Sequence, residues 1–104
     1  MSVELHAAGA GRFRLAGELG FASVPELPVN PPGSGDISVA LDDVQRVDSA
    51  GLALLLQWVR SARSAGGQVT FTGIPSQLAA IARVSGVDAI LAVDENAAPV
   101  RGEP

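Results

Sequence analysis

The sequence contains no cysteine and no lysine. Without cysteine, it offers no disulfide, no zinc–thiolate centre and no cysteine nucleophile. All seven cations are arginine, and the formal net charge of −4 leaves no basic footprint for nucleic acid or for an anionic membrane. The longest apolar run, residues 50–56, is far shorter than the roughly 20 residues that cross a bilayer. These absences argue against a nucleic-acid-binding protein and against direct insertion into a membrane.

The composition predicts one folded domain. The chain has 104 residues, of which 47% are hydrophobic and 17% charged, and this is enough to bury a core without cross-links. The first residues carry neither the positive segment nor the apolar core of a signal peptide, which predicts a cytoplasmic location. A cytoplasmic protein can still dock on a membrane complex through protein contacts.

The first half of the chain predicts a hairpin, a long loop and a third strand. Residues 3–7 and 12–16 alternate apolar and polar side chains around a glycine-containing turn, which is typical of a β-hairpin. Four prolines and two glycines fall within residues 21–36, so this Pro/Gly-rich loop has room for at most one short helical turn. Residues 37–41 alternate again and predict a strand, which the two aspartates that follow it are expected to end.

The second half predicts two helices with a strand between them. Asp48 or Ser49 can cap a first helix, which runs to about Ala65 and ends at the glycine pair 66–67. The remaining predicted elements are a strand at residues 68–72, a second helix from Pro75 or Ser76 to Gly86, and a short closing strand at residues 87–93.

This order of elements predicts an α/β fold. Two strands joined through one helix form a parallel pair with a right-handed crossover, whereas the hairpin adds an antiparallel pair. We therefore expect a single domain at residues 1–93, with a mixed four- to five-stranded sheet and helices packed on one face. Residues 94–104 are expected to form a flexible C-terminal tail.

The first helix has an unusually wide apolar side. On a helical wheel, its core-facing residues are Leu52, Leu55, Leu56, Val59 and Ala62. Leu54 and Trp58 lie beside them, so the apolar arc spans about 200°, wider than a one-sided surface helix needs. We therefore expect the helix start, Leu54 and Trp58 to form an accessible docking surface. The alternative is that a flanking loop buries Leu54 and Trp58.

Ser49 lies at the start of this helix. Helix N-termini present unpaired N–H donors and a partial positive charge, so a serine there can cap the helix, contact a partner or receive a phosphate. A phosphate would add about −1.5 to −2 charge to the docking surface, and Asp48 beside it would add repulsion. The alternative is a plain N-cap.

The segment from Asp48 to Leu56 resembles the signature of STAS domains, a family named after sulfate transporters and anti-sigma factor antagonists. The family pattern is a strand, an aspartate, a serine or threonine, a small residue, and Gly-Leu opening a helix, and the chain reads Asp-Ser-Ala-Gly-Leu at residues 48–52. The resemblance covers roughly residues 3–91 and makes residues 1–93 a STAS-like domain. The family often has a helix where this chain has the Pro/Gly-rich loop 21–36.

Within the family, the chain looks most like STAS domains of the MlaB type, the cytoplasmic subunits of an ABC transporter that moves phospholipids between Gram-negative membranes. The family's key hydroxyl residue falls on Ser49. Ala50 and Ala53 replace a serine and a glycine that are common in sigma-regulating members, which favours the transporter branch. The resemblance implies a non-enzymatic subunit, peripheral to the inner membrane through protein contacts, that binds and regulates an MlaF-like ATPase. The expected partner-binding residues are Asp48, Ser49, Ala50, Gly51, Ala53, Leu54 and Trp58.

The resemblance also leaves an alternative function, an anti-sigma factor antagonist whose Ser49 is phosphorylated by an anti-sigma factor kinase. We expect no enzyme, no cofactor and no metal, because no catalytic constellation stands out. A catalytic triad would need His6 near a serine and a carboxylate, but His6 lies in a predicted strand, and we expect it to be a strand or surface residue. Asp42 and Asp43 are expected to have loop roles, and Asp48 to cap the helix.

Overall fold

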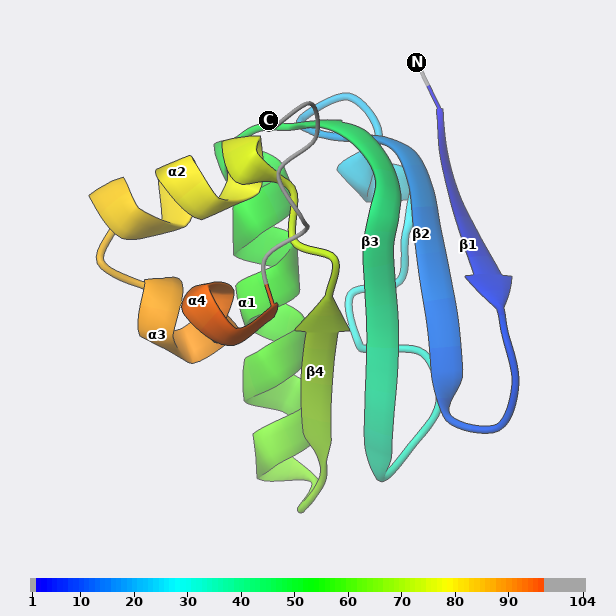
Figure 1. Ribbon diagram of the computed structural model, residues 1–104. Coiled ribbons are helices and arrows are strands. Elements are labelled where there is room, and N and C mark those ends of the chain that lie inside the picture. The colour runs from blue at the N-terminus through cyan, green and yellow to red at the C-terminus, as the bar shows by residue number, and fades with distance from the viewer. Residues whose placement is uncertain (1, 97–104) are drawn as a thin grey trace, which may run out of the picture.

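The strands pair in a mixed sheet whose order follows the chain. The computed structural model describes residues 2–96, without the side chains of residues 94 and 95. Strand β1 (Val3–Ala7) pairs antiparallel with β2 (Arg12–Leu19). Strand β3 (Asp36–Val47) pairs parallel with both β2 and β4 (Gln68–Thr72), which gives the order β1-β2-β3-β4 (Figure 1). The predicted α/β fold with a mixed sheet is confirmed, with four strands in the described part of the chain.

Strand β3 is much longer than predicted. Asp42 and Asp43 do not end it, because β2 continues to pair alongside, with Ala16 opposite Asp43 and Leu19 opposite Val47. Two register shifts absorb the extra residues of β3. The prediction that these aspartates break the strand is therefore wrong. Because β3 runs alongside β2 up to Val47, the next helix begins beside the end of β2.

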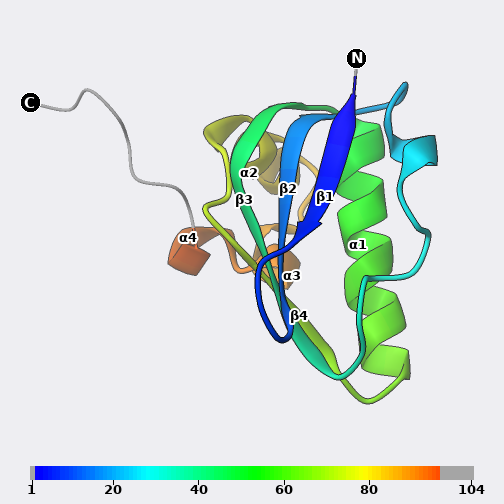
Figure 2. The same cartoon turned by 90° about the vertical axis from the view of Figure 1, so that its right-hand side faces the viewer.

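Helix α1 (Ser49–Ser64) covers one face of the sheet, as predicted (Figure 2). Its inward residues interlock with those of β3 and β4, and Leu55 is fully buried. The helix ends as predicted, at the glycine pair. Gly66 has φ of 82° and donates to the Arg63 carbonyl, while Gly67 donates to the Ala62 carbonyl at 2.8 Å. This Schellman motif pairs carbonyls that the helix end leaves free.

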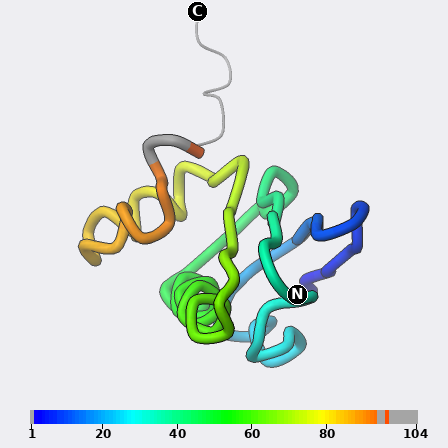
Figure 3. The backbone as a smooth tube through the Cα atoms, turned by 90° about the horizontal axis from the view of Figure 1, so that it is seen from below, coloured from blue at the N-terminus to red at the C-terminus, as the bar shows by residue number. Residues whose placement is uncertain are grey.

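Three short helices follow β4: α2 (Ser76–Val84), α3 (Asp88–Leu91) and α4 (Val93–Asn96). They gather on the β4 side of the molecule, away from β1 (Figure 3). The predicted closing strand at 87–93 is wrong, since its buried residues Leu91 and Val93 are carried by two helical turns joined at Ala92, whose φ is 53°. Helix α4 takes up residues 94–96, and the rest of the predicted tail, 97–104, lies outside the described residues.

The Pro/Gly-rich loop runs alongside α1 (Figure 2). It contains the one short turn expected of it, the 3-10 helix η1 (Val24–Glu26). Its Leu27 is buried, and its Pro28 carbonyl accepts a hydrogen bond from Trp58 Nε1 at 3.0 Å. The loop therefore takes the place of a covering helix on this side of α1. Within residues 2–96, no helix is long and apolar enough to cross a membrane.

Candidate functional site

Two residues predicted to be exposed at the docking surface lie in the core. Trp58 is 0% exposed and Leu54 7% exposed, so the prediction that they remain accessible is wrong. The physical reason is the loop: it packs over the wide apolar side of α1, and its Pro28 carbonyl pairs with the indole N–H. The alternative, burial by a flanking loop, is the one that the structure adopts.

Gly51 is also buried, and its lack of a side chain lets the start of α1 lie close to the ends of β2 and β3. A Cβ at this position would lie 2.2 Å from the Leu19 carbonyl oxygen and 2.9 Å from a Val47 methyl group. No side chain larger than hydrogen fits between the helix and the ends of β2 and β3. Gly51 thus sets the depth of the helix start against the sheet, and it is not presented to a partner.

Asp48 ties the helix start to the loop that follows β2. Its Oδ1 accepts hydrogen bonds from the backbone N–H groups of Ala50 (2.9 Å) and Gly51 (3.2 Å), so it is the N-cap of α1. Its Oδ2 accepts from the backbone N–H of Phe21 at 3.0 Å. One carboxylate therefore fixes two chain segments that are 27 residues apart.

These hydrogen bonds favour the charged form of the Asp48 carboxyl. The bond from the Phe21 backbone is the largest cause that lowers the pKa of Asp48 below its ordinary value of 3.8; the Gly51 and Ala50 bonds add to it, and partial burial opposes them. The positive end of the helix α1 dipole acts in the same direction. Asp48 is therefore ionised at neutral pH and holds both segments.

Ser49, Ala50 and Ala53 form the outward side of the helix start. Ser49 and Ala53 are exposed and lie one turn apart, while Ala50 is half-buried. Ser49 is the first residue of α1, and its hydroxyl makes no hydrogen bond with another described residue. This part of the predicted partner-binding set is therefore accessible, uncharged and formed by small side chains.

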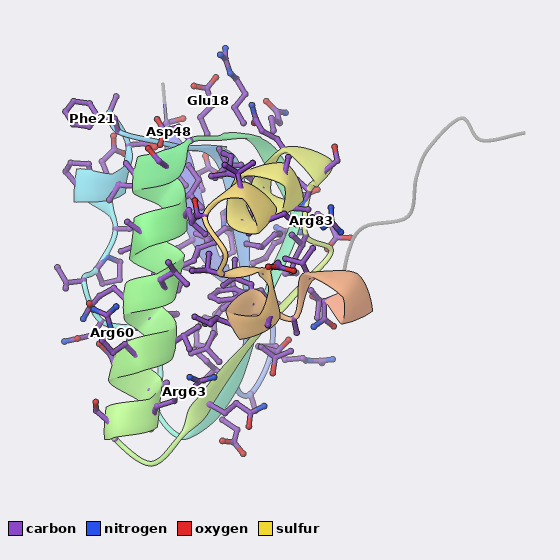
Figure 4. All side chains as sticks on the ribbon, turned by 90° about the vertical axis from the view of Figure 1, so that its left-hand side faces the viewer. Glu18, Phe21, Asp48, Arg60, Arg63 and Arg83 are labelled. Atoms are coloured by element: carbon purple, nitrogen blue, oxygen red, sulfur yellow. The ribbon has the colours of Figure 1, made fainter. Side chains whose placement is uncertain are left out.

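Phe21 is the residue that sequence reasoning missed. Its side chain is 82% exposed, and it lies at the same end of the molecule as Asp48 (Figure 4). A signal was present, because Phe21 follows the end of a strand and stands between Gly20 and Ala22, outside any apolar alternation. We call Phe21, Ser49, Ala50 and Ala53 the helix-start surface.

A shallow hollow lies beside Phe21, with a volume of about 410 Å³. Its lining combines loop residues 20–23 and the apolar strand ends Leu19 and Val47 with four polar or charged residues, Glu18, Arg46, Asp48 and Gln77. The Gln77 side chain accepts a hydrogen bond from the Val47 backbone at 2.8 Å, so α2 also braces this end of β3. The hollow is thus open, has both polar and apolar lining residues, and is bordered by an exposed aromatic ring.

The described residues offer no arrangement for metal binding or triad chemistry. No group of three or more histidine, aspartate or glutamate side chains comes together in this part of the chain. His6 Nε2 lies 2.9 Å from Glu4 Oε1 on β1, far along the sheet from the helix start, and Asp43 pairs with Arg14 at 3.5 Å. What the helix start can do chemically is contact another molecule or accept a group on the Ser49 hydroxyl.

Comparison with known proteins gives one family. A family model described as "Mlab, STAS domain" matches residues 3–92. Proteins called anti-sigma-B factor antagonist from Staphylococcus aureus strains NCTC 8325 / PS 47, COL and Mu50 / ATCC 700699 are 26% identical over 87 residues, which cover 79% of this chain and 81% of theirs. Both matches include the helix start with Asp48 and Ser49.

Proposed function

The chain belongs to the STAS domain family of the MlaB type, and from this premise we propose that it is a non-enzymatic subunit that binds and regulates the ATPase of an ABC-type phospholipid transporter. Its partner is an MlaF-like ATPase, and it resides in the cytoplasm against the inner membrane through that contact. The protein contributes contacts and not chemistry, and it acts by stabilising or activating the ATPase.

The observation that carries this proposal is that the helix-start surface is accessible while the residues beneath it are packed in the core. Ser49 and Ala53 are exposed, while Gly51 and Leu54 beneath them are buried. The small, uncharged side chains of Ser49, Ala50 and Ala53 lose little side-chain entropy and little hydration when a partner covers them. The cap by Asp48 fixes the surface before binding, which lowers the cost of association.

The test is binding to the purified ATPase whose gene accompanies that of this chain. Ala53→Arg places a long charged side chain in the middle of the helix-start surface, and we expect it to weaken binding at least about tenfold, or 1.4 kcal/mol. Ala80→Arg is the matched control, since Ala80 is an exposed alanine on α2. Equal affinities of the two variants would contradict the proposed surface, and no binding by the wild type would contradict the proposed function.

Ser49 supports a second function, an anti-sigma factor antagonist controlled by phosphorylation. The hydroxyl is exposed and unbonded to other described residues at the first position of α1, and the 26% identical relatives are anti-sigma-B factor antagonists. A phosphate there would add about −1.5 to −2 charge beside the Asp48 carboxylate, and the repulsion would disfavour an uncharged or acidic partner surface.

This second function predicts phosphate transfer to one residue. Purified anti-sigma factor kinase and ATP should add a single phosphate to the wild type and none to Ser49→Ala, as read by mass spectrometry. Ser76→Ala is the matched control, because Ser76 is the first and exposed residue of α2. Phosphate on another residue, or none on the wild type, would contradict this function.

A further inference from the structure

Phe21 is held in place although its side chain faces solvent. Its backbone N–H donates to Asp48 Oδ2, and the turn around it is closed by Gly20, whose carbonyl accepts from the N–H groups of Ser23 (3.0 Å) and Val24 (2.8 Å). The Ser23 hydroxyl is buried, accepts from the Gly20 N–H at 3.0 Å and donates to the Glu18 carbonyl. The ring therefore projects from a turn whose backbone is pinned at both ends.

The exposed Phe21 ring leaves a large apolar surface in water. Its apolar surface is hydrated, and burial of a phenylalanine side chain would yield about 1.5–3 kcal/mol. The Phe21 ring stays outside the core, although Leu27 of the same loop is buried and the loop covers Trp58. The fold therefore does not use the Phe21 ring for its own stability, and because the backbone of the turn is already fixed, binding costs little further backbone entropy.

The charges around Phe21 indicate the kind of surface that receives it. The hollow beside the ring carries the carboxylates of Glu18 and Asp48 and one cation, Arg46. Glu26, at the end of η1, is a further exposed carboxylate of the same loop, outside the lining of the hollow. Neither Glu18 nor Glu26 forms an ion pair with another residue between 2 and 96. The border of the ring is thus net acidic, and its electrostatic complement is a basic border.

We propose that Phe21 is the anchor of the docking surface and inserts its ring into an apolar socket of the partner protein, bordered by arginine or lysine side chains that face Glu18. This inference rests on the proposed function and adds the residue and the partner chemistry that determine the affinity. Asp48 is the positioning residue, because it fixes the backbone N–H of Phe21 relative to Ser49.

The first arm of the test removes the ring. The dissociation constant of the full-length chain with the purified ATPase is measured for Phe21→Ala and for Val84→Ala, which trims an equally exposed apolar side chain at the far end of α2 (90% exposed). We expect Phe21→Ala to weaken binding about 30-fold or more, and Val84→Ala to change it less than about twofold. A loss under about tenfold for Phe21→Ala overturns the inference.

The second arm tests the basic border. Glu18→Gln should lower the association rate constant at low salt, and the difference from the wild type should shrink as salt is raised, since attraction between exposed charges is screened. Asp36→Asn is the matched control, because it removes one exposed carboxylate at the opposite end of β3. An unchanged or faster association of Glu18→Gln overturns the basic border.

The two proposals fail in different ways. If Ala53→Arg abolishes binding and Phe21→Ala does not, the inference about Phe21 is wrong and the proposed function stands. If the wild type forms no complex with the ATPase, both are wrong. Circular dichroism of each variant checks that the fold is retained, and Phe21→Leu, which keeps an apolar side chain, should recover part of the affinity lost by Phe21→Ala.

Discussion

Phe21, at the start of the Pro/Gly-rich loop, and Trp58, on α1 beneath the middle of that loop, are two large aromatic residues with opposite roles. The residue pattern of α1 predicts an exposed Trp58 side chain. In the structure the loop covers this side chain completely, and its Nε1 donates to the Pro28 carbonyl. Phe21 comes from the start of the same loop and is 82% exposed. The comparison shows that the loop, and not the helix alone, decides which part of α1 remains available to a partner.

The start and the middle of the loop differ because their backbone is held differently. Near Phe21, Asp48 and Ser23 fix a tight turn whose hydrogen bonds point inward and whose side chain points outward. Near Pro28, the chain is extended along α1 and offers carbonyl groups and apolar side chains to the helix. The start of the loop presents a side chain to solvent, and its middle completes the core.

Removal of the buried indole should have the largest effect on stability. We expect Trp58→Ala to lower the free energy of unfolding by about 3–5 kcal/mol, because it leaves a cavity under the loop. Trp58→Phe, which keeps an aromatic ring but loses some volume and the bond to Pro28, should cost less, about 1–2 kcal/mol. Urea unfolding measures both; a cost of Trp58→Ala below about 1 kcal/mol would mean that the loop does not cover the indole in solution.

A methyl group at residue 51 should have the next largest effect. Gly51→Ala places a Cβ against the Leu19 carbonyl, which belongs to rigid backbone, so the helix start must move away from the sheet. We expect a loss of about 1–3 kcal/mol, typical of overpacking. The control is Ala53→Ser, which changes an exposed residue of the same helix. Gly66→Ala would be a poor control, because Gly66 has a positive φ that alanine disfavours even though there is space for a Cβ. Equal stability of Gly51→Ala and Ala53→Ser would contradict the close approach.

Loss of the Asp48 carboxylate should have a moderate effect that depends on pH. Asp48→Ala removes the N-cap and the bond to Phe21, and we expect a cost of about 1 kcal/mol at neutral pH. Because the folded state lowers the pKa of Asp48, its contribution is complete above the ordinary value of 3.8 and is lost as pH falls through the lower, folded value.

The pH dependence is measured as the difference in unfolding free energy between the wild type and Asp48→Asn. Asparagine caps helices nearly as well as aspartate but does not titrate. We expect the difference to shrink as pH is lowered from about 5 to about 2, since residue 48 loses a charge only in the wild type. A difference that stays constant over this range would show that the carboxylate charge contributes nothing to the link between loop and helix.

Removal of the exposed ring should have the smallest effect on stability. Phe21→Ala should change the free energy of unfolding by no more than about 0.5 kcal/mol, because the side chain makes few contacts. The same substitution at the buried Phe71 of β4 should cost about 3–5 kcal/mol. A loss above about 1 kcal/mol for Phe21→Ala would mean that the ring packs on the protein, and the comparison with Trp58 would no longer hold.

Local rules predicted most of the fold. Alternation predicted β1, β2 and β4, and the glycine pair predicted the end of α1 through its Schellman motif. The continuation of β3 through Asp42 depends on β2 pairing alongside, which local composition does not express. The helical turns α3 and α4 were missed for a related reason, since seven residues with buried Leu91 and Val93 fit either a strand or short helices.

The candidate site was predicted only in part. The signature at residues 48–52 located the helix start and the accessible Ser49, whose surroundings are set by local capping. The burial of Trp58 and the exposure of Phe21 depend on the path of a loop with four prolines, and that path is fixed by contacts far apart in the sequence. Side-chain periodicity on one helix carries no information about what lies over it.

Hydrogen exchange of the chain with and without the purified ATPase tests the central claim most directly, because it maps where the partner binds. We predict that peptides covering residues 18–24 and 48–54 gain protection in the complex, whereas peptides covering α3 and β1 do not. Protection confined to α2 and α3, or to the sheet, with unchanged exchange around Phe21 and Ser49, would contradict the account.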